Sequence, residues 1–319
     1  MTRYIRNTVV TAKVEATAGT DALPTGLADA VLVSDMSITP LDAANIDRNN
    51  IKGFFGANEQ LVGPASVKTS YTVELAGSGT AGTAPALGDL LLGCAMAEGV
   101  LADPVRVEYT PVSTGLKTLT NYYYDDGVLH KLLGVMGDFT LTAKVGERPV
   151  LKFDYTGLDG GISEAMTVGT FTEWKAPVAM TKANVTDITL GATYALGALT
   201  GGTPYNSTGL ELKSGNAVNF TPMLSKEDVD ITNREVTGSF ELELTAAQEV
   251  AFMAEVKANT KQSLALTIGK VAGNTVIIFM PAAQLTNPKK AELNGKRLIG
   301  YDFRAIPVVG NDELRLVFL

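Results

Sequence analysis

Apolar and polar residues alternate along several segments, as they do in antiparallel strands with one buried face. The segment SYTVEL (70–75) places Glu74 between two apolar residues, and SFELEL (239–244) does the same for Glu241. Glu243 lies on the same side of the second segment as Glu241. Each strand is therefore expected to present one apolar face and one face that carries carboxylates.

A further carboxylate in each half has the same setting. Asp154 lies between two aromatic residues in a predicted pair of strands at 138–157. Asp302 lies between two aromatic residues in a predicted pair of strands at 282–305. Both acids are expected on the polar side of their strands.

A spacing typical of helices follows the first alternating strand of each half. Within residues 86–99, apolar side chains recur at i, i+3, i+4 and i+7, namely Leu87, Leu90, Leu91 and Cys94. The stretch 245–258 carries a less regular apolar arc, made of Phe252, Met253 and Val256. One helix is therefore expected to cover the apolar face of each sheet.

The order of these elements occurs twice, which indicates an internal duplication. GLADAVLVSDMSITPLD (26–42) has a counterpart in GLELKSGNAVNFTPMLS (209–225), and the alternating strand and the helix follow both. A hairpin comes next in each half, with turns expected near residues 126–127 and 273–274.

The pattern predicts a mainly β (α+β) chain of two duplicated domains, each an antiparallel β-sandwich or half-barrel with one flanking helix. The first domain is expected at 1–160 and carries an inserted loop at 49–66, where the second half has only a short turn. The second domain is expected at 161–319, with 161–208 supplying connecting strands and a linker.

Composition favours a protein that works within an assembly. Of the 319 residues, 45% are apolar and 19% are charged, compared with roughly 25% charged residues in ordinary soluble domains. The net charge of -8 argues against tight binding to nucleic-acid phosphates. The longest apolar runs, such as 276–280, are much shorter than the ~20 residues of a membrane-spanning helix, so no membrane association is expected.

Residues that would support catalysis are scarce. The chain has a single histidine, His130, and a single cysteine, Cys94, which do not make a structural zinc site. The run from Gly77 to Gly82 fits the G-x-G-x-x-G spacing of dinucleotide-binding loops, but it follows an alternating strand and not a continuously apolar one. The second half makes the same connection with Thr245-Ala-Ala. We interpret the run as a strand-to-helix connection and expect neither a cofactor nor enzymatic activity.

The inserted loop contains an aromatic pair, Phe54 and Phe55, framed by Gly53 and Gly56. Two interpretations remain open for this pair. It contacts another molecule, or the loop caps the core of its own chain.

Several segments together resemble the major tail tube protein family of long-tailed bacteriophages, especially those with non-contractile tails. They are AKVEATAGTDALPTG, VLVSDMSITPLDA, TVELAGSGTAGTAPALGDLLLGC, YYYDDGVLHKLLG and GERPVLKFDYTGL. Within them, ELAGSGTAGTAPA is the most specific block. The resemblance covers most of residues 10–160, and the second half resembles the family mainly through the duplication.

The resemblance implies a structural virion protein with two tail-tube domains, located in the phage tail after assembly in the host cytoplasm. Six such domains would surround a lumen, and rings would stack into a tube that conducts DNA into the host without binding it specifically. Three chains would make a pseudo-hexameric ring, with a ring of six chains as the alternative. The expected partners are further copies of the chain, a tape-measure protein, a tail terminator and distal tail proteins.

The resemblance also suggests two sets of site residues. Acids expected to line the lumen, where they would keep DNA from adhering, are Glu74, Asp154, Glu241, Glu243 and Asp302. Residues expected to contact the next ring are Lys52, Phe54, Phe55, Asn58 and Glu59. Another virion protein with a β-sandwich fold, either a capsid decoration or a tail-tip or receptor-binding module, is the alternative function.

Overall fold

The computed structural model describes residues 2–319, and most of them form antiparallel strands. This confirms the prediction of a mainly β chain. The elements up to the end of the first predicted domain are a 3-10 helix (Ile5–Asn7), β1 (Thr8–Val14), β2 (Ala30–Val31), β3 (Ser34–Asp47), β4 (Gln60–Glu74), α1 (Gly88–Leu92), β5 (Met96–Ala102), β6 (Val105–Pro111), β7 (Leu119–Asp125), β8 (Val128–Lys144) and β9 (Val150–Glu164). Those that follow are β10 (Ile188–Ala195), β11 (Ala198–Tyr205), β12 (Ser207–Lys213), β13 (Asn216–Met223), β14 (Lys226–Arg234), β15 (Thr237–Leu242), α2 (Ala246–Lys257), β16 (Lys261–Ile268), β17 (Val276–Leu293), β18 (Lys296–Ala305) and β19 (Arg315–Phe318).

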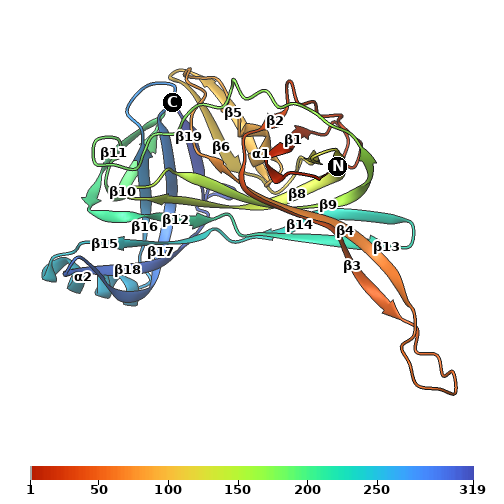
Figure 1. The fold of residues 1–319 in the computed structure, drawn as a ribbon. Coiled ribbons are helices and arrows are strands. Elements are labelled where there is room, and N and C mark those ends of the chain that lie inside the picture. Colours follow the sequence, from red (N-terminus) through yellow and green to blue (C-terminus); the bar gives the residue numbers. More distant parts are fainter. Residues whose placement is uncertain (1) are drawn as a thin grey trace.

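One long sheet, here called the main sheet, crosses the whole molecule. Its strands follow the order β3–β4–β9–β8–β12–β15–β18–β17, and all neighbours are antiparallel. The two halves of the chain meet where β8 pairs with β12, and Thr142 lies opposite Glu211 there. In Figure 1 the main sheet runs across the lower part of the molecule.

Apart from β13 and β14, the remaining strands rise above the main sheet in Figure 1 and close the core from the other side. In the first half, β2, β1 and β7 pair in succession and reach the first part of β8. In the second half, β11, β10 and β16 reach the first part of β17 in the same way. The C-terminal β19 joins β17 to β6, so β5 and β6 of the first half complete the upper layer of the second.

The apolar core between these layers is continuous across both halves. Its largest fully buried side chains include Tyr71, Phe153 and Tyr155 in the first half and Tyr301 and Phe303 in the second. These aromatic residues lie on the strand faces opposite the carboxylates. The alternation in the sequence therefore predicts correctly which side of each strand is buried.

The first predicted helix is much shorter than expected. The sequence predicts a helix within 86–99, whereas α1 covers Gly88–Leu92 and the following Met96–Ala102 form β5. The helix ends at Gly93, and Ala95 then adopts a φ of 57°, which is outside the helical range. The four apolar residues that carry the prediction are nevertheless all buried.

The second predicted helix agrees closely with α2. Its start is fixed by a capping box, in which the Gln248 N–H donates to the Thr245 hydroxyl and the Thr245 N–H donates to the Gln248 side chain. Phe252 on α2 is buried and lies 5.7 Å from Tyr301 between ring centroids, so the helix covers the main sheet. No helix among the described residues is long and apolar enough to cross a membrane.

Both predicted hairpins are present, but their second strands continue further than the sequence suggests. The sequence predicts two strands in each of these regions, namely the second strand of the hairpin and a separate strand after it. In the structure the two are one long strand, β8 in the first half and β17 in the second. Pairing with β9 shifts register between Leu133 and Met136, and pairing with β18 shifts between Thr286 and Lys289. Such bulges bend a strand, so its first part pairs in the upper layer and its last part belongs to the main sheet.

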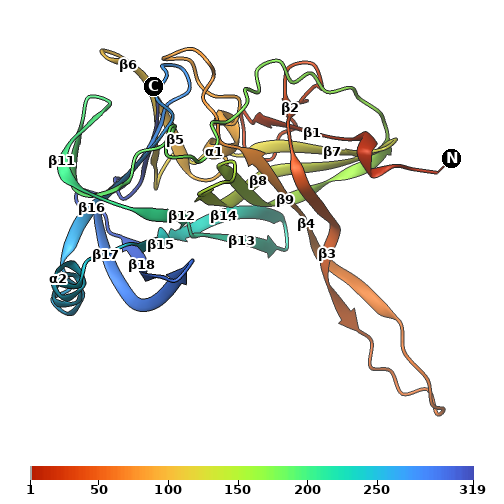
Figure 2. The same ribbon diagram turned by 60° about the vertical axis from the view of Figure 1, so that its left-hand side comes forward.

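β3 and β4 extend far beyond the body of the molecule as a two-stranded arm (Figure 2). The loop at its tip spans 48–59, because residues 60–66 of the predicted insertion belong to β4. In the second half, the hairpin of β13 and β14 turns tightly at 224–225 and lies beside β8 and β9.

Candidate functional site

The solvent-facing side of the main sheet is polar, and the strand register aligns its residues into rows. One row crosses seven strands, and its charged members are all carboxylates. In order from β4 to β17 it contains Glu74, Val150, Thr142, Glu211, Ser239, Asp302 and Thr286. We call it the acidic row.

The neighbouring row on the same face carries the opposite charge. It crosses the same strands two residues away and contains Thr72, Lys152, Thr140, Lys213, Thr237, Arg304 and Gln284. We call it the basic row. Residues two apart on a strand are about 7 Å apart, so rows of opposite sign lie side by side.

The five candidate lumen acids all lie on this polar side, and four of them contact a cation. The pairs and their N···O distances are Glu74–Arg148 at 2.9 Å, Asp154–Lys152 at 3.0 Å, Glu243–Lys296 at 3.1 Å and Asp302–Lys289 at 3.3 Å. Glu241 accepts a hydrogen bond from the Thr208 hydroxyl at 3.1 Å. The pKa of Glu243 is below its ordinary value because the Asn206 amide and the Lys296 ammonium both donate to its carboxylate.

The residues predicted for this face are all acids, whereas the structure also places lysines on it. Lys144 lies 3.3 Å from Glu211 and Lys213 lies 3.5 Å from Asp138, and both ion pairs cross the junction of β8 and β12. The period-two alternation that identifies the acids also places these lysines on the polar side, so the sequence contained the signal. The face therefore carries lysines beside the predicted acids, and its charge is mixed.

The tip of the arm exposes apolar side chains without a partner in its own chain. Phe55 is 106% exposed, Ile51 is 101% exposed and Phe54 is 74% exposed. Gly53 between them has a φ of 76°, a conformation that favours glycine. This exposure excludes the interpretation of the loop as a cap on the core of the same chain.

The other candidate residues of the loop have different positions. Glu59 forms an ion pair with Arg48 at 2.6 Å, and the Asn58 amide donates to the Asn50 carbonyl at 2.9 Å. Both contacts close the base of the loop. Lys52 is exposed beside the apolar tip.

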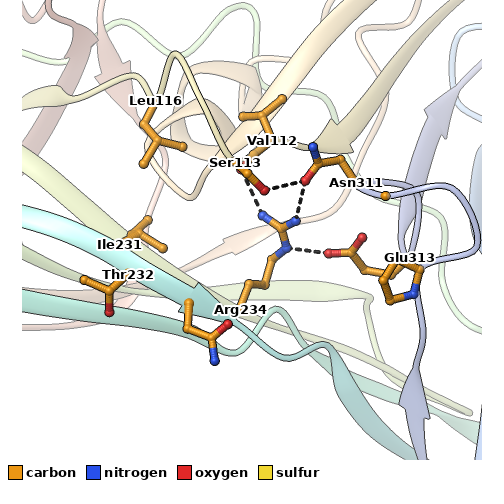
Figure 3. Close-up of a pocket in the computed structure, with 11 residues that line it drawn as sticks. Val112, Ser113, Leu116, Ile231, Thr232, Arg234, Asn311 and Glu313 are labelled. Carbon is orange, nitrogen blue, oxygen red and sulfur yellow. Dashed lines mark hydrogen bonds and ion pairs between the residues drawn. The ribbon is translucent and has the colours of Figure 1, made fainter.

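A buried ion pair ties β14 to loops of both halves (Figure 3). Arg234 donates to Glu313 at 2.6 Å, and these side chains are only 10% and 8% exposed. Arg234 also donates to the Val112 carbonyl at 3.0 Å and to the Asn311 side chain at 3.1 Å, and Ser113 donates to Asn311 at 2.6 Å. The adjoining cavity measures about 420 Å³. Because the Arg234 guanidinium bonds to Glu313, Val112 and Asn311, which lie in loops of both halves, we interpret the cluster as a clamp between the halves.

The glycine run contacts the other half of the chain. The Gly77 N–H donates to the Asn274 side chain at 3.2 Å, and the Gly79 N–H donates to the Gly273 carbonyl at 2.8 Å. A Cβ atom on Gly273 would lie 2.4 Å from the carbonyl carbon of Gly79, so this approach requires glycine. The N–H groups of Gly77 and Gly79, which a phosphate would need, are used in joining the two halves.

A second buried charge cluster lies where β6, β10 and β19 meet. The Glu108 carboxylate accepts hydrogen bonds from Arg106 at 2.6 Å, from Tyr194 at 2.5 Å and from Arg315. Burial alone would raise the pKa of Glu108, but the hydrogen bonds from Tyr194 and Arg106 and the charge of Arg315 lower it below its ordinary value. The cluster fixes the C-terminal strand to the first half.

The described residues offer little for catalysis. Among residues 2–319, no group of three or more His, Cys, Asp or Glu side chains is placed to hold a metal ion. Cys94 is completely buried, and burial raises the pKa of its thiol. The prominent features of the molecule are surfaces, namely the charged face of the main sheet and the apolar tip of the arm.

A mainly β chain with one continuous charged sheet face and a projecting arm fits the class of structural assembly proteins. Comparison with protein families places it more closely, because the family profile of the phage tail tube protein matches residues 5–305. The chain therefore belongs to the phage tail tube protein family, which is a family of structural tail proteins and not of enzymes. No curated protein matches the chain.

Proposed function

We propose that this protein polymerises as stacked rings into a phage tail tube and that the polar face of the main sheet lines the channel for DNA ejection. The carrying observation is that a single sheet crosses both halves and places the charged side chains of the acidic and basic rows on one face. Membership of the tail tube family supports the same assembly.

Alternating charge rows suit a channel that must not retain DNA. The acidic and basic rows are about 7 Å apart, which is less than the Debye length of ~8 Å at physiological salt. Their fields therefore largely cancel a short distance from the wall. A passing duplex would meet a surface without the clustered cations that bind phosphates.

The duplication supports three chains for each ring. Tyr71 lies opposite Phe153 in the first half, and Phe240 lies opposite Tyr301 in the second. This shared register supports two equivalent tail-tube domains at 1–160 and 161–319. Three such chains would give a pseudo-hexamer, in which each half contributes four strands of the main sheet.

The arm is proposed to reach the neighbouring ring. Its apolar tip, with Phe54 and Phe55, would be buried there, and the exposed Lys52 would lie at the rim of the contact. Asn58 and Glu59 would shape the loop from within, through their contacts with Asn50 and Arg48. The tape-measure, terminator and distal tail proteins would meet the rings at the lumen and at the ends of the tube.

Electron microscopy of the purified protein tests this function. Concentrated protein should form rings or tubes with a central channel, and mass measurement of single rings should give three chains. Monodisperse monomers at every concentration would contradict tube formation and favour a decoration or tail-tip protein. Rings of six chains would mean that only one half of each chain lines the channel.

A further inference from the structure

A polar cavity of about 290 Å³ lies on the solvent side of the main sheet, beside the base of the arm. It is lined by β3, β4, β8 and β9 of the first half and by β13 of the second half, which runs beside β8 and β9 (Figure 2). A single water molecule needs a space of roughly 30 Å³. The cavity is therefore large enough for a hydrated ion, and it lies where the arm, the main sheet and the second half meet.

Two carboxylates of the cavity lie directly opposite each other on neighbouring strands, Asp138 on β8 and Asp154 on β9. The Cβ atoms of opposite residues are ~4.5–5.5 Å apart, and like charges at this separation destabilise a sheet. The Asp138 side chain is only 15% exposed, so water screens its charge poorly. A cation between the two carboxylates would replace this repulsion with attraction.

Two neutral oxygens of the same cavity lack a partner. Oδ1 of Asn216 and Oγ of Ser70 are buried without a hydrogen bond to any of the described residues. Asn216 is only 8% exposed, and its Nδ2 donates to the Cys94 carbonyl at 2.8 Å and to the Gly137 carbonyl at 3.0 Å. These two bonds fix the amide and leave its Oδ1 for the cavity. Ser70 lies opposite Asp154, so its hydroxyl is in line with the two carboxylates. Buried oxygens of this kind are costly unless a donor or a cation meets them.

Two lysines neighbour the carboxylates from outside. Lys152 lies 3.0 Å from Asp154, and Lys213 lies 3.5 Å from Asp138, measured between nitrogen and oxygen. Their side chains are 52% and 59% exposed. Ion pairs of exposed lysines contribute little to stability, so an ion held by both carboxylates can displace the two ammonium groups.

The second half has the equivalent position without a second carboxylate. Asp302 is the equivalent of Asp154, and the residue opposite it on the next strand is Thr286. Asp302 is also neutralised within the chain, because the Asn287 amide donates to it at 3.1 Å and the Lys289 ammonium lies 3.3 Å away. The opposed carboxylates and the unpartnered oxygens therefore occur together in the first half and not at its equivalent.

We propose that this cavity binds a calcium ion through Asp138, Asp154, Ser70 and Asn216, with water completing the coordination shell. Ca²⁺ takes six to eight oxygen ligands, accepts both carboxylate and amide oxygens and tolerates irregular geometry. Mg²⁺ demands near-ideal octahedral geometry and gives up its water reluctantly, so it fits this set of ligands less well. The two carboxylates balance the charge of the ion.

The bound ion joins parts of the chain that are far apart in sequence. Its ligands come from β4, β8 and β9 of the first half and from β13 of the second, so calcium ties the second half to the strand that carries the arm. With two carboxylates and two neutral oxygens, the site is compatible with the lack of metal clusters of three or more His, Cys, Asp or Glu among residues 2–319. Because the ion binds the folded chain, it stabilises the fold.

Calorimetric titration of the unpolymerised protein with calcium chloride tests the site, after removal of metal with EDTA and at physiological ionic strength. We expect one ion for each chain. Asp154→Asn removes one of the two carboxylates and should weaken binding at least about tenfold. At a calcium concentration ~100 times the Kd, the equilibrium constant for unfolding in urea should fall about 100-fold in the unaltered protein and stay unchanged in Asp154→Asn.

The equivalent acid of the second half provides the matched control, since Asp302→Asn removes the same charge from the same face and should leave calcium binding unchanged. Asp138 also accepts the Asn216 N–H at 2.9 Å, so its substitution disturbs the fold, and Ser70→Ala is the second variant of the test instead. Ser70→Ala should also weaken binding. Absence of calcium binding, or equal affinity in Asp154→Asn and Asp302→Asn, would overturn the site. Magnesium binding as tight as calcium binding would overturn the assignment to calcium.

Discussion

The clamp between Arg234 and Glu313 gives the sharpest prediction for a single chain. In Arg234→Met, the Glu313 carboxylate, with only 8% of its side chain exposed, loses its cation, and the Val112 carbonyl loses a donor. Removing one partner of a buried ion pair typically costs about 3–5 kcal/mol, because the remaining charge stays out of water. We expect this loss in the free energy of unfolding, measured by urea denaturation of unpolymerised protein.

A surface pair provides the matched control. Arg304 and Glu235 are 2.6 Å apart but 59% and 49% exposed, so Arg304→Met should cost less than about 1 kcal/mol. The double variant Arg234→Met/Glu313→Leu removes both buried charges and should recover most of the stability lost in Arg234→Met. Equal losses in Arg234→Met and Arg304→Met, or no recovery in the double variant, would refute the clamp as a buried charge pair.

Three further predictions concern acid stability, the arm and the channel. The pKa of Glu108 is lower in the folded chain than its ordinary value of 4.5, so the Glu108 carboxylate stabilises the fold fully above pH 4.5 and loses this effect as pH falls through the folded pKa. In Glu108→Gln, the free energy of unfolding should therefore fall less steeply with pH in this acidic range. Phe54→Ser/Phe55→Ser should leave unfolding unchanged but raise the protein concentration needed for tube formation at least tenfold, since each buried Phe contributes ~1.5–3 kcal/mol, and an unchanged threshold in light scattering would contradict the inter-ring contact. Glu74→Lys/Glu241→Lys should preserve tubes and slow DNA release from particles relative to the matched Gln variants, whereas equal release rates would refute the role of balanced charge.

Local pattern was sufficient for much of the fold. Alternation identified the buried aromatic faces and the polar positions of Glu74, Asp154 and Asp302, because a strand with one wet face has a period of two wherever it lies. The apolar arc within 245–258 gave the bounds of α2 closely. Each of these properties depends on neighbours in the sequence.

The missed features depend on residues far apart in the chain. The helix within 86–99 stops early because residues 96–102 pair with β6, and the apolar spacing of Leu87 to Cys94 does not contain that information. Alternation places Lys152 and Lys213 on the polar side, but their alignment into a row beside the acids is defined only when seven strands are placed in register. Residues 287–293 of β17 pair on one side only, with β18, and this too depends on contacts between residues far apart in the chain.

A three-dimensional reconstruction of the assembled tube tests the central claim most directly. We predict rings of three chains in which Glu211 and Lys213, on the polar face of the main sheet, point into the channel, while α2 lies outside. A map in which α2 or the upper strands face the channel would contradict this assignment.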